Sequence, residues 1–153
     1  MRRLLAALLC LATVADAAAQ PAAPPHAWLF GTWTGGLFPA AAHPTPEACL
    51  AQPSVIFTRD VVMRATLTDV TYQQRVVATA NVRGDRTDFT FAPVPAQSGP
   101  TDPLTGLATA VAGGQGFGCA GPDELHVVRR SNNEIVFPGC ADFPNPLVRC
   151  PSR

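Results

Sequence analysis

The chain has 153 residues and no formal net charge at pH 7; 47% of its residues are hydrophobic and only 14% are charged. A sequence of this length and composition predicts one domain with a substantial hydrophobic core. The charges are balanced and form no basic run, which argues against nucleic acid or an anionic membrane surface as the partner.

The first nineteen residues have the parts of a secretory signal peptide. Arg2 and Arg3 form a basic start, an uncharged apolar run covers Leu4 to Val14, and small residues at 17–19 suit signal peptidase. The apolar run is too short for a permanent transmembrane helix, and no second long run follows. We therefore expect residues 1–19 to be removed on export. The mature chain would have 134 residues, no membrane span, and a periplasmic or secreted location.

Four cysteines lie beyond the signal peptide, and an even number in an exported domain predicts two disulfides. Zinc ligands usually come in close pairs, whereas the nearest two of these cysteines are ten residues apart, so the spacing favours disulfides over a metal site. Three pairings are possible, and the only preference is that Cys140–Cys150 would close the smallest loop. The four residues are Cys49, Cys119, Cys140 and Cys150.

Beyond residue 19 the sequence predicts short strands after a brief leader. Residues 20–27 form a proline- and alanine-rich leader typical of extended chain. Residues 70–80 alternate with the period of a half-buried strand, and Arg83-Gly84-Asp85 then reads as a hairpin turn rather than an adhesion motif. The expected strands are 28–34, 55–67 with a bend or bulge near Arg59–Asp60, 70–80, 87–92, 116–119, 124–130 and 134–137.

Two long segments rich in proline and glycine interrupt these strands. Residues 35–53 are expected to form a loop with one helical turn at 47–50. Residues 93–115 predict a longer excursion with a short helix inside 104–112. Segments of this length are uncommon in compact domains and are usually functional or disordered. The tail from residue 138 has four prolines and two cysteines, and predicts a stapled coil.

Six or seven short strands with almost no helix predict an all-β fold. The favoured architecture is a small antiparallel β-barrel, with a β-sandwich as the alternative. Disulfides would staple it, and long Pro/Gly-rich loops would extend from it. We expect residues 28–153 to form this single β domain.

The sequence lacks the familiar catalytic and cofactor motifs. The glycine-rich stretch at 113–118 precedes a strand, whereas a dinucleotide-binding loop precedes a helix. None of the four serines beyond the signal peptide lies in a G-x-S-x-G elbow. Asp85 and Asp88 flank a turn, where carboxylates are usually solvated, and His126 alternates within a strand. We expect no catalytic residue, no metal ligand and no cofactor; a hydrolase with dispersed residues is a third hypothesis.

Phe30-Gly31-Thr32-Trp33 resembles the G-x-W signature on the first strand of lipocalins and related small calycin barrels. The resemblance implies that Gly31 lets the strand pass close to the N-terminal segment and that Trp33 plugs the barrel floor. It also implies an arginine from a late strand on the tryptophan ring, with Arg129 or Arg130 in that position. Small bacterial exported barrels that inhibit proteases also begin with such a strand.

These observations favour a non-catalytic exported binding module. Loops 35–53 and 93–115 would be presented on a rigid barrel to a protein partner or a small apolar ligand. A ligand would need an apolar cavity, which side chains can fill completely in a barrel of this size. The alternative is an inhibitor of a periplasmic or extracellular hydrolase, a protease or a lysozyme, that inserts the leader or a stapled loop into the enzyme's cleft.

Overall fold

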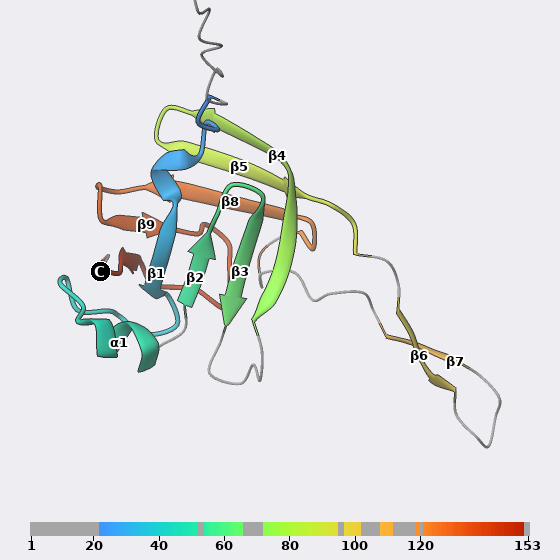
Figure 1. The fold of residues 1–153 in the computed structure, drawn as a ribbon. Coiled ribbons are helices and arrows are strands. Elements are labelled where there is room, and N and C mark those ends of the chain that lie inside the picture. Colours follow the sequence, from blue (N-terminus) through green and yellow to red (C-terminus); the bar gives the residue numbers. More distant parts are fainter. Residues whose placement is uncertain are drawn as a thin grey trace, which may run out of the picture.

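Ten strands form a barrel and a separate hairpin, shown in Figure 1. The computed structural model describes residues 22–51, 54–65, 72–94, 97–101, 108–111, 119 and 121–151. The barrel strands are β1 (Gly31–Gly35), β2 (Ser54–Phe57), β3 (Val61–Ala65), β4 (Gln73–Arg83), β5 (Arg86–Phe91), β8 (Glu124–Arg129), β9 (Glu134–Val136) and β10 (Leu147–Arg149). The hairpin strands are β6 (Gln97–Thr101) and β7 (Ala108–Val111), and the helices are the 3-10 turn η1 (Ala27–Leu29) and α1 (Pro46–Ala51).

The eight barrel strands are antiparallel and closed, in the order β1-β10-β9-β8-β5-β4-β3-β2. Each strand therefore pairs with its neighbours along the chain once the β6–β7 hairpin is set aside, and β10 returns to pair with β1. Closure leaves the barrel without the two free sides of an open sheet. The all-β barrel with two disulfides is confirmed, and the alternative of a sandwich is not adopted.

Side-chain alternation sets the inward face of each strand. On β5, Thr87, Phe89 and Phe91 are buried, and the residues between them face outward. On β8, Leu125 and Val127 are buried, and they lie opposite Phe89 and Thr87 respectively. The register thus places the apolar residues of neighbouring strands side by side in the interior.

The stretch expected to be one bent strand, residues 55–67, contains two strands and a tight turn. Thr58 closes that turn, because its hydroxyl donates to the carbonyl of Val61 at 2.7 Å and accepts from the amide of Val61 at 3.0 Å. The apolar character continues across the turn because both strands bury residues, Phe57 before it and Val62 after it. Hydrophobic content alone therefore did not reveal the hairpin.

Three other expectations need correction. Trp28 lies in η1 and not in the first strand, which begins at Gly31. Residues 108–111, inside the range 104–112 that was expected to hold a short helix, form β7. The tail contains β10, the strand that closes the barrel. The expected helical turn at 47–50 is confirmed as part of α1.

Two further expectations lie outside the described residues: the signal peptide at 1–19 and residues 116–118 of an expected strand. Within the part of the chain that is described, no helix is both long enough and apolar enough to cross a bilayer.

Aromatic side chains fill the barrel. Phe89 lies 5.7 Å from Phe57 and 6.2 Å from Phe91 between ring centres, and Phe137 lies 5.5 Å from Phe143. These spacings are those of directly packed rings. The largest fully buried side chains are Trp33, Phe57, Phe89, Phe91, Phe143, Leu29, Leu125, Ile135, Leu147, Val55 and Val62.

The two ends of the barrel differ in their connections. We call one the turn end; it carries η1 and the short connections 58–60, 84–85 and 130–133. We call the other the loop end. Successive strands run in opposite directions, so all the long connections leave from this end. They cover residues 36–53, 66–72, 92–123 (with the β6–β7 hairpin) and 137–146.

Candidate functional site

Trp33 is completely buried, and Arg149 lies over it. The Trp33 indole donates to the carbonyl of Leu29 at 2.8 Å, and the Arg149 guanidinium lies 4.2 Å from the centre of the Trp33 ring. Arg149 also donates to the carbonyls of Trp28 at 2.5 Å and Phe30 at 2.8 Å. Burial lowers the pKa of Arg149 from its usual value, and the charge of nearby Arg129 lowers it further. Arg149 therefore contacts both the β1 strand, with which β10 closes the barrel, and the N-terminal turn η1.

The arginines expected over Trp33 lie elsewhere. Arg129 covers Trp28 at 4.9 Å from the ring centre, and Arg130 is exposed at the start of the β8–β9 turn. The arginine on Trp33 is Arg149 of β10, a strand that was not predicted because the prolines of the tail indicated coil. Gly31 adopts a φ of +118°, which residues with a side chain rarely adopt, and a Cβ there would lie 3.5 Å from Arg149 Nη1. The close neighbour of Gly31 is thus the arginine.

The disulfides join Cys49 to Cys150 and Cys119 to Cys140. The smallest-loop preference for Cys140–Cys150 was wrong. Cys49 is on α1, where Thr45 accepts from the amide of Ala48 at 3.2 Å as the helix begins. The first disulfide therefore ties the β1–β2 connection to the residue after β10, and the second ties two long connections of the loop end to each other.

Two buried arginines support the loop end from inside the barrel. Arg64 on β3 and Arg75 on β4 are each only 3% exposed. Arg64 pairs with Asp142 in the β9–β10 connection, and Arg75 pairs with Asp123 just before β8. Paired charges of this kind hold the backbone that carries the acid, because separating them would leave a buried cation uncompensated.

Further contacts of these arginines strengthen the bracing. Arg75 donates to the carbonyls of Pro122 at 2.5 Å and Ala92 at 3.4 Å, at the two ends of the β5–β8 connection. Its guanidinium also lies 5.3 Å from the centre of the Phe91 ring. The sequence reasoning missed both arginines. The sequence did contain a signal for them. In the alternating pattern, Arg64 shares the inward face of β3 with Val62, and Arg75 shares the inward face of β4 with Val77.

Backbone contacts join the β1–β2 connection to the β9–β10 connection. Asn145 donates from its backbone to the carbonyl of Gly36 at 2.7 Å and from its side chain to the carbonyl of Leu37 at 3.0 Å. Gly36 has a φ of +79°, and a Cβ there would overlap the ring of Phe143. Residues 36 and 37 are therefore held by hydrogen bonds from Asn145 and by packing against Phe143.

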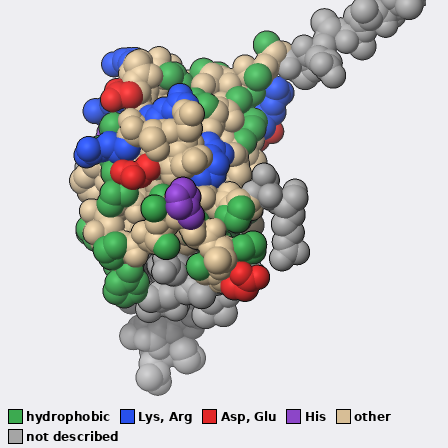
Figure 2. Space-filling model, turned by 90° about the vertical axis from the view of Figure 1, so that its left-hand side faces the viewer, with side chains coloured by type: hydrophobic (Ala, Val, Ile, Leu, Met, Phe, Trp, Pro, Cys, Tyr) green, Lys and Arg blue, Asp and Glu red, His purple; other side chains and the backbone are tan. Residues whose placement is uncertain are grey.

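Phe38 stands on this braced segment and is 52% exposed, although it is a large apolar side chain. Exposed prolines surround the same connections, at positions 39, 138, 144 and 146. On the face in Figure 2, the arginine side chains among the described residues lie in the upper half, toward the turn end. An exposed aromatic residue on a rigid support is typical of a protein-binding surface.

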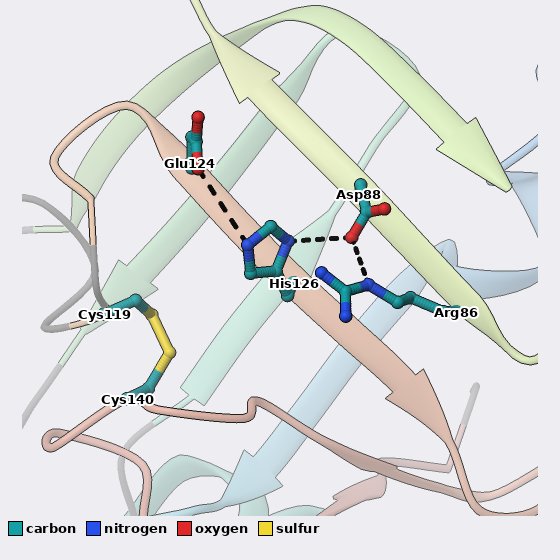
Figure 3. A network of polar contacts seen from close by, with 6 residues as sticks. All are labelled: Arg86, Asp88, Cys119, Glu124, His126 and Cys140. Carbon is teal, nitrogen blue, oxygen red and sulfur yellow. Dashed lines mark hydrogen bonds and ion pairs between the residues drawn. A yellow bond between two sulfur atoms is a disulfide. The ribbon is translucent and has the colours of Figure 1, made fainter. Parts of the chain in front are cut away.

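A polar cluster lies on the outer wall of β5 and β8 (Figure 3). His126 Nδ1 is 2.7 Å from an Asp88 oxygen that also accepts from Arg86 Nε at 2.5 Å. His126 Nε2 is 3.9 Å from Glu124. The hydrogen bond from Arg86 lowers the pKa of Asp88, against desolvation that raises it, and the bond to His126 lowers it further.

The chemistry of this cluster is limited. A histidine oriented by an aspartate can act as a base towards a nucleophile that it contacts. Both nitrogens of His126, however, lie beside carboxylates, those of Asp88 and Glu124, and a carboxylate is not a nucleophile that a histidine would activate. In the described ranges, no group of three or more His, Cys, Asp or Glu side chains is arranged to hold a metal ion. We interpret the cluster as an outer-surface ion network joining β5 to β8.

Comparisons of the chain with protein-family models, with curated proteins and with solved structures found no match.

Proposed function

We propose that this chain is an exported, non-catalytic binding module that recognises a protein partner through its loop end. The observation that carries the proposal is Phe38, half exposed on a segment fixed by Asn145 and bordered by prolines. A preorganised loop loses little conformational freedom on binding, so its apolar contacts contribute more fully to affinity. The two disulfides fit an oxidising, extracytoplasmic compartment, and export by the signal peptide at 1–19 is part of the proposal.

The packing of the barrel favours a protein partner over a small apolar ligand. The inward side chains are large rings in direct contact, and the arginines at the loop end of the interior are paired with loop aspartates. A carrier needs an apolar cavity of several hundred Å³. One hollow of about 600 Å³ lies on the surface of the described part of the chain, beside Phe137, Pro144 and Pro146.

The lipocalin-like resemblance stays at the level of architecture. A closed eight-stranded antiparallel barrel, Gly31 at a positive φ, and a tryptophan covered by an arginine support kinship with small calycin barrels as a proposal. Fold likeness does not supply a function. The function therefore depends on the loop end.

Site-specific photo-crosslinking tests the proposal. A photoreactive phenylalanine analogue at position 38 should capture a protein partner in the producing cell's envelope or medium. The matched control carries the analogue at position 76, because Val76 is 55% exposed on the barrel wall and equally accessible. Crosslinks from position 76 to a protein other than this chain, with none from position 38, would contradict the proposal. Native mass spectrometry should show the protein without a small-molecule adduct.

The second candidate is a hydrolase inhibitor, favoured by the rigidity of the segment that carries Phe38. A braced, protruding aromatic residue suits insertion into an enzyme cleft. Purified protein should then inhibit a member of a panel of extracellular proteases and lysozymes, and Phe38→Ser should reduce inhibition at least about tenfold, as loss of a central anchor does. Inhibition unchanged by Phe38→Ser would move the contact elsewhere.

A further inference from the structure

We propose that β4 pairs with β4 of a second copy of this chain, at the turn end of the barrel. The surface is the free edge of β4 from Ala78 to Arg83. The occupant is the same edge of another molecule, related by a two-fold axis and running antiparallel. This proposal is independent of the proposed function, because the edge lies at the opposite end of the barrel from Phe38.

The free edge exists because β4 is longer than β3. The first half of β4 pairs with β3, and the last contact on that side is the bond from the amide of Val77 to the carbonyl of Asp60 at 2.8 Å. Beyond Val77, β4 continues for six residues and pairs only with β5. Figure 1 shows this β4–β5 hairpin extending past β3.

The register shows which backbone groups are free. The hairpin turns at Gly84, so Arg83 and Arg86 face each other, as do Asn81 and Asp88. In a two-residue hairpin such pairs exchange hydrogen bonds, and the residues between them direct their amides and carbonyls outward. On β4, the residues with outward-directed backbone groups are Ala80 and Val82, and β3 does not extend far enough to pair with them. Unpaired backbone groups on an exposed edge are a template for another strand.

The edge lacks the usual protection against pairing. Residues 78–82 contain no charge and no proline, and Val82 is 38% exposed. The leader borders a hollow of about 310 Å³ along Val77–Ala80, but prolines 24 and 25 have no amide to donate. The leader segment 22–25 is held to the barrel by one side-chain contact, from Arg59 to the carbonyl of Ala22 at 3.1 Å. It does not satisfy the edge.

The edge is complementary to itself in both register and charge. With the two-fold axis at Asn81, Ala80 of each copy lies opposite Val82 of the other, and two such pairs give about four hydrogen bonds. The end of β4 then lies beside the β2–β3 turn of the second copy. Arg83 approaches the second copy's Asp60, and the contact occurs twice. Neither of these side chains has a hydrogen bond or ion pair with another described residue.

Sedimentation equilibrium of the disulfide-bonded protein tests the inference. Edge pairing buries less surface than a stable dimer needs, so we expect a monomer–dimer equilibrium with a dissociation constant of about 10–100 µM. Val82→Pro should raise this constant at least about tenfold, because it removes one edge amide from each copy. Val82→Thr is the matched control, since it retains the amide. A strictly monomeric protein at about 1 mM would overturn the proposal.

A charge exchange keeps the test decisive if Val82→Pro fails to fold. Arg83→Asp and Asp60→Arg should each weaken dimerisation about fivefold through like-charge contacts. The double variant should restore it, because each new aspartate then meets a new arginine on the other copy. A dimer insensitive to these three variants would use another surface, and the β4 edge would be excluded.

Discussion

The guanidinium of Arg149 lies 4.2 Å from the ring centre of Trp33, on the neighbouring strand of the closed barrel. Trp33 and Arg149 are also direct partners in the β1–β10 register. The contact thus joins residues 116 positions apart at the point where the barrel closes. The same guanidinium binds the carbonyls of Trp28 and Phe30, which fixes η1 beneath the ring.

Trp33→Ala should cost about 3–5 kcal/mol of unfolding free energy, because it removes a completely buried indole from the core. Trp28→Ala should cost less, since Trp28 is only partly buried and packs at the edge of the core. Urea titrations of both variants measure the difference. Equal or reversed losses would show that Trp33 does not act as the plug.

Arg149→Met should cost about 2–3 kcal/mol, because the carbonyls of Trp28 and Phe30 lose a charged donor. Arg129→Met is the matched control, since Arg129 covers Trp28 from a more exposed position and should cost about 1 kcal/mol or less. Thermal and denaturant unfolding of the two variants compare them. A larger loss for Arg129→Met would reverse the assigned roles.

Removing the disulfides should have unequal effects. Cys49–Cys150 spans 101 residues and Cys119–Cys140 spans 21. Loop-closure entropy then predicts losses of about 4.7 and about 3 kcal/mol for the two double-serine variants. Urea midpoints measure both. Both variants should weaken crosslinking from position 38, because Cys49 lies on the connection that carries Phe38 and Cys140 lies on the connection whose Asn145 holds Leu37.

The ionised form of Asp88 should stabilise the fold above the unfolded-state pKa of an aspartate. The folded-state pKa is lowered, with the hydrogen bond from Arg86 as the largest cause, so folding favours the carboxylate. This contribution is therefore present above about pH 4 and is lost as the pH falls through the folded pKa.

Carbon-13 NMR titration of the Asp88 carboxyl measures this shift directly. Arg86→Gln should raise the Asp88 pKa more than His126→Gln does, because Arg86 provides the larger contribution. A larger pKa rise in His126→Gln than in Arg86→Gln would show that His126, and not Arg86, is the main cause of the lowered Asp88 pKa.

The alternating strands were predictable because each pattern is local. Residues 87–92 and 124–130 were expected as strands, and β5 and β8 lie within one residue of those bounds. Strand β10 was not predictable in the same way. It has only three residues, with Pro146 before it and Pro151 soon after it, and it is a strand only because β1 and β9 flank it.

The candidate site was less accessible from sequence for the same reason. The importance of Phe38 depends on Asn145, which is more than one hundred residues away. Arg64 and Arg75 are buried because Asp142 and Asp123 reach them from distant connections. The disulfide pairing likewise follows from which connections the barrel brings together, which spacing between cysteines does not reveal.

The described chain enters the barrel at η1, at the turn end, whereas Cys150 after β10 is bonded to Cys49 on the connection that carries Phe38. Anything attached through the N-terminal side, whether a purification tag, a fused reporter or a solid support, would therefore be on the side away from Phe38. Immobilised in this way, every molecule would display the same surface to the solution. Binding assays on a sensor chip would then sample the loop end without interference from the attachment.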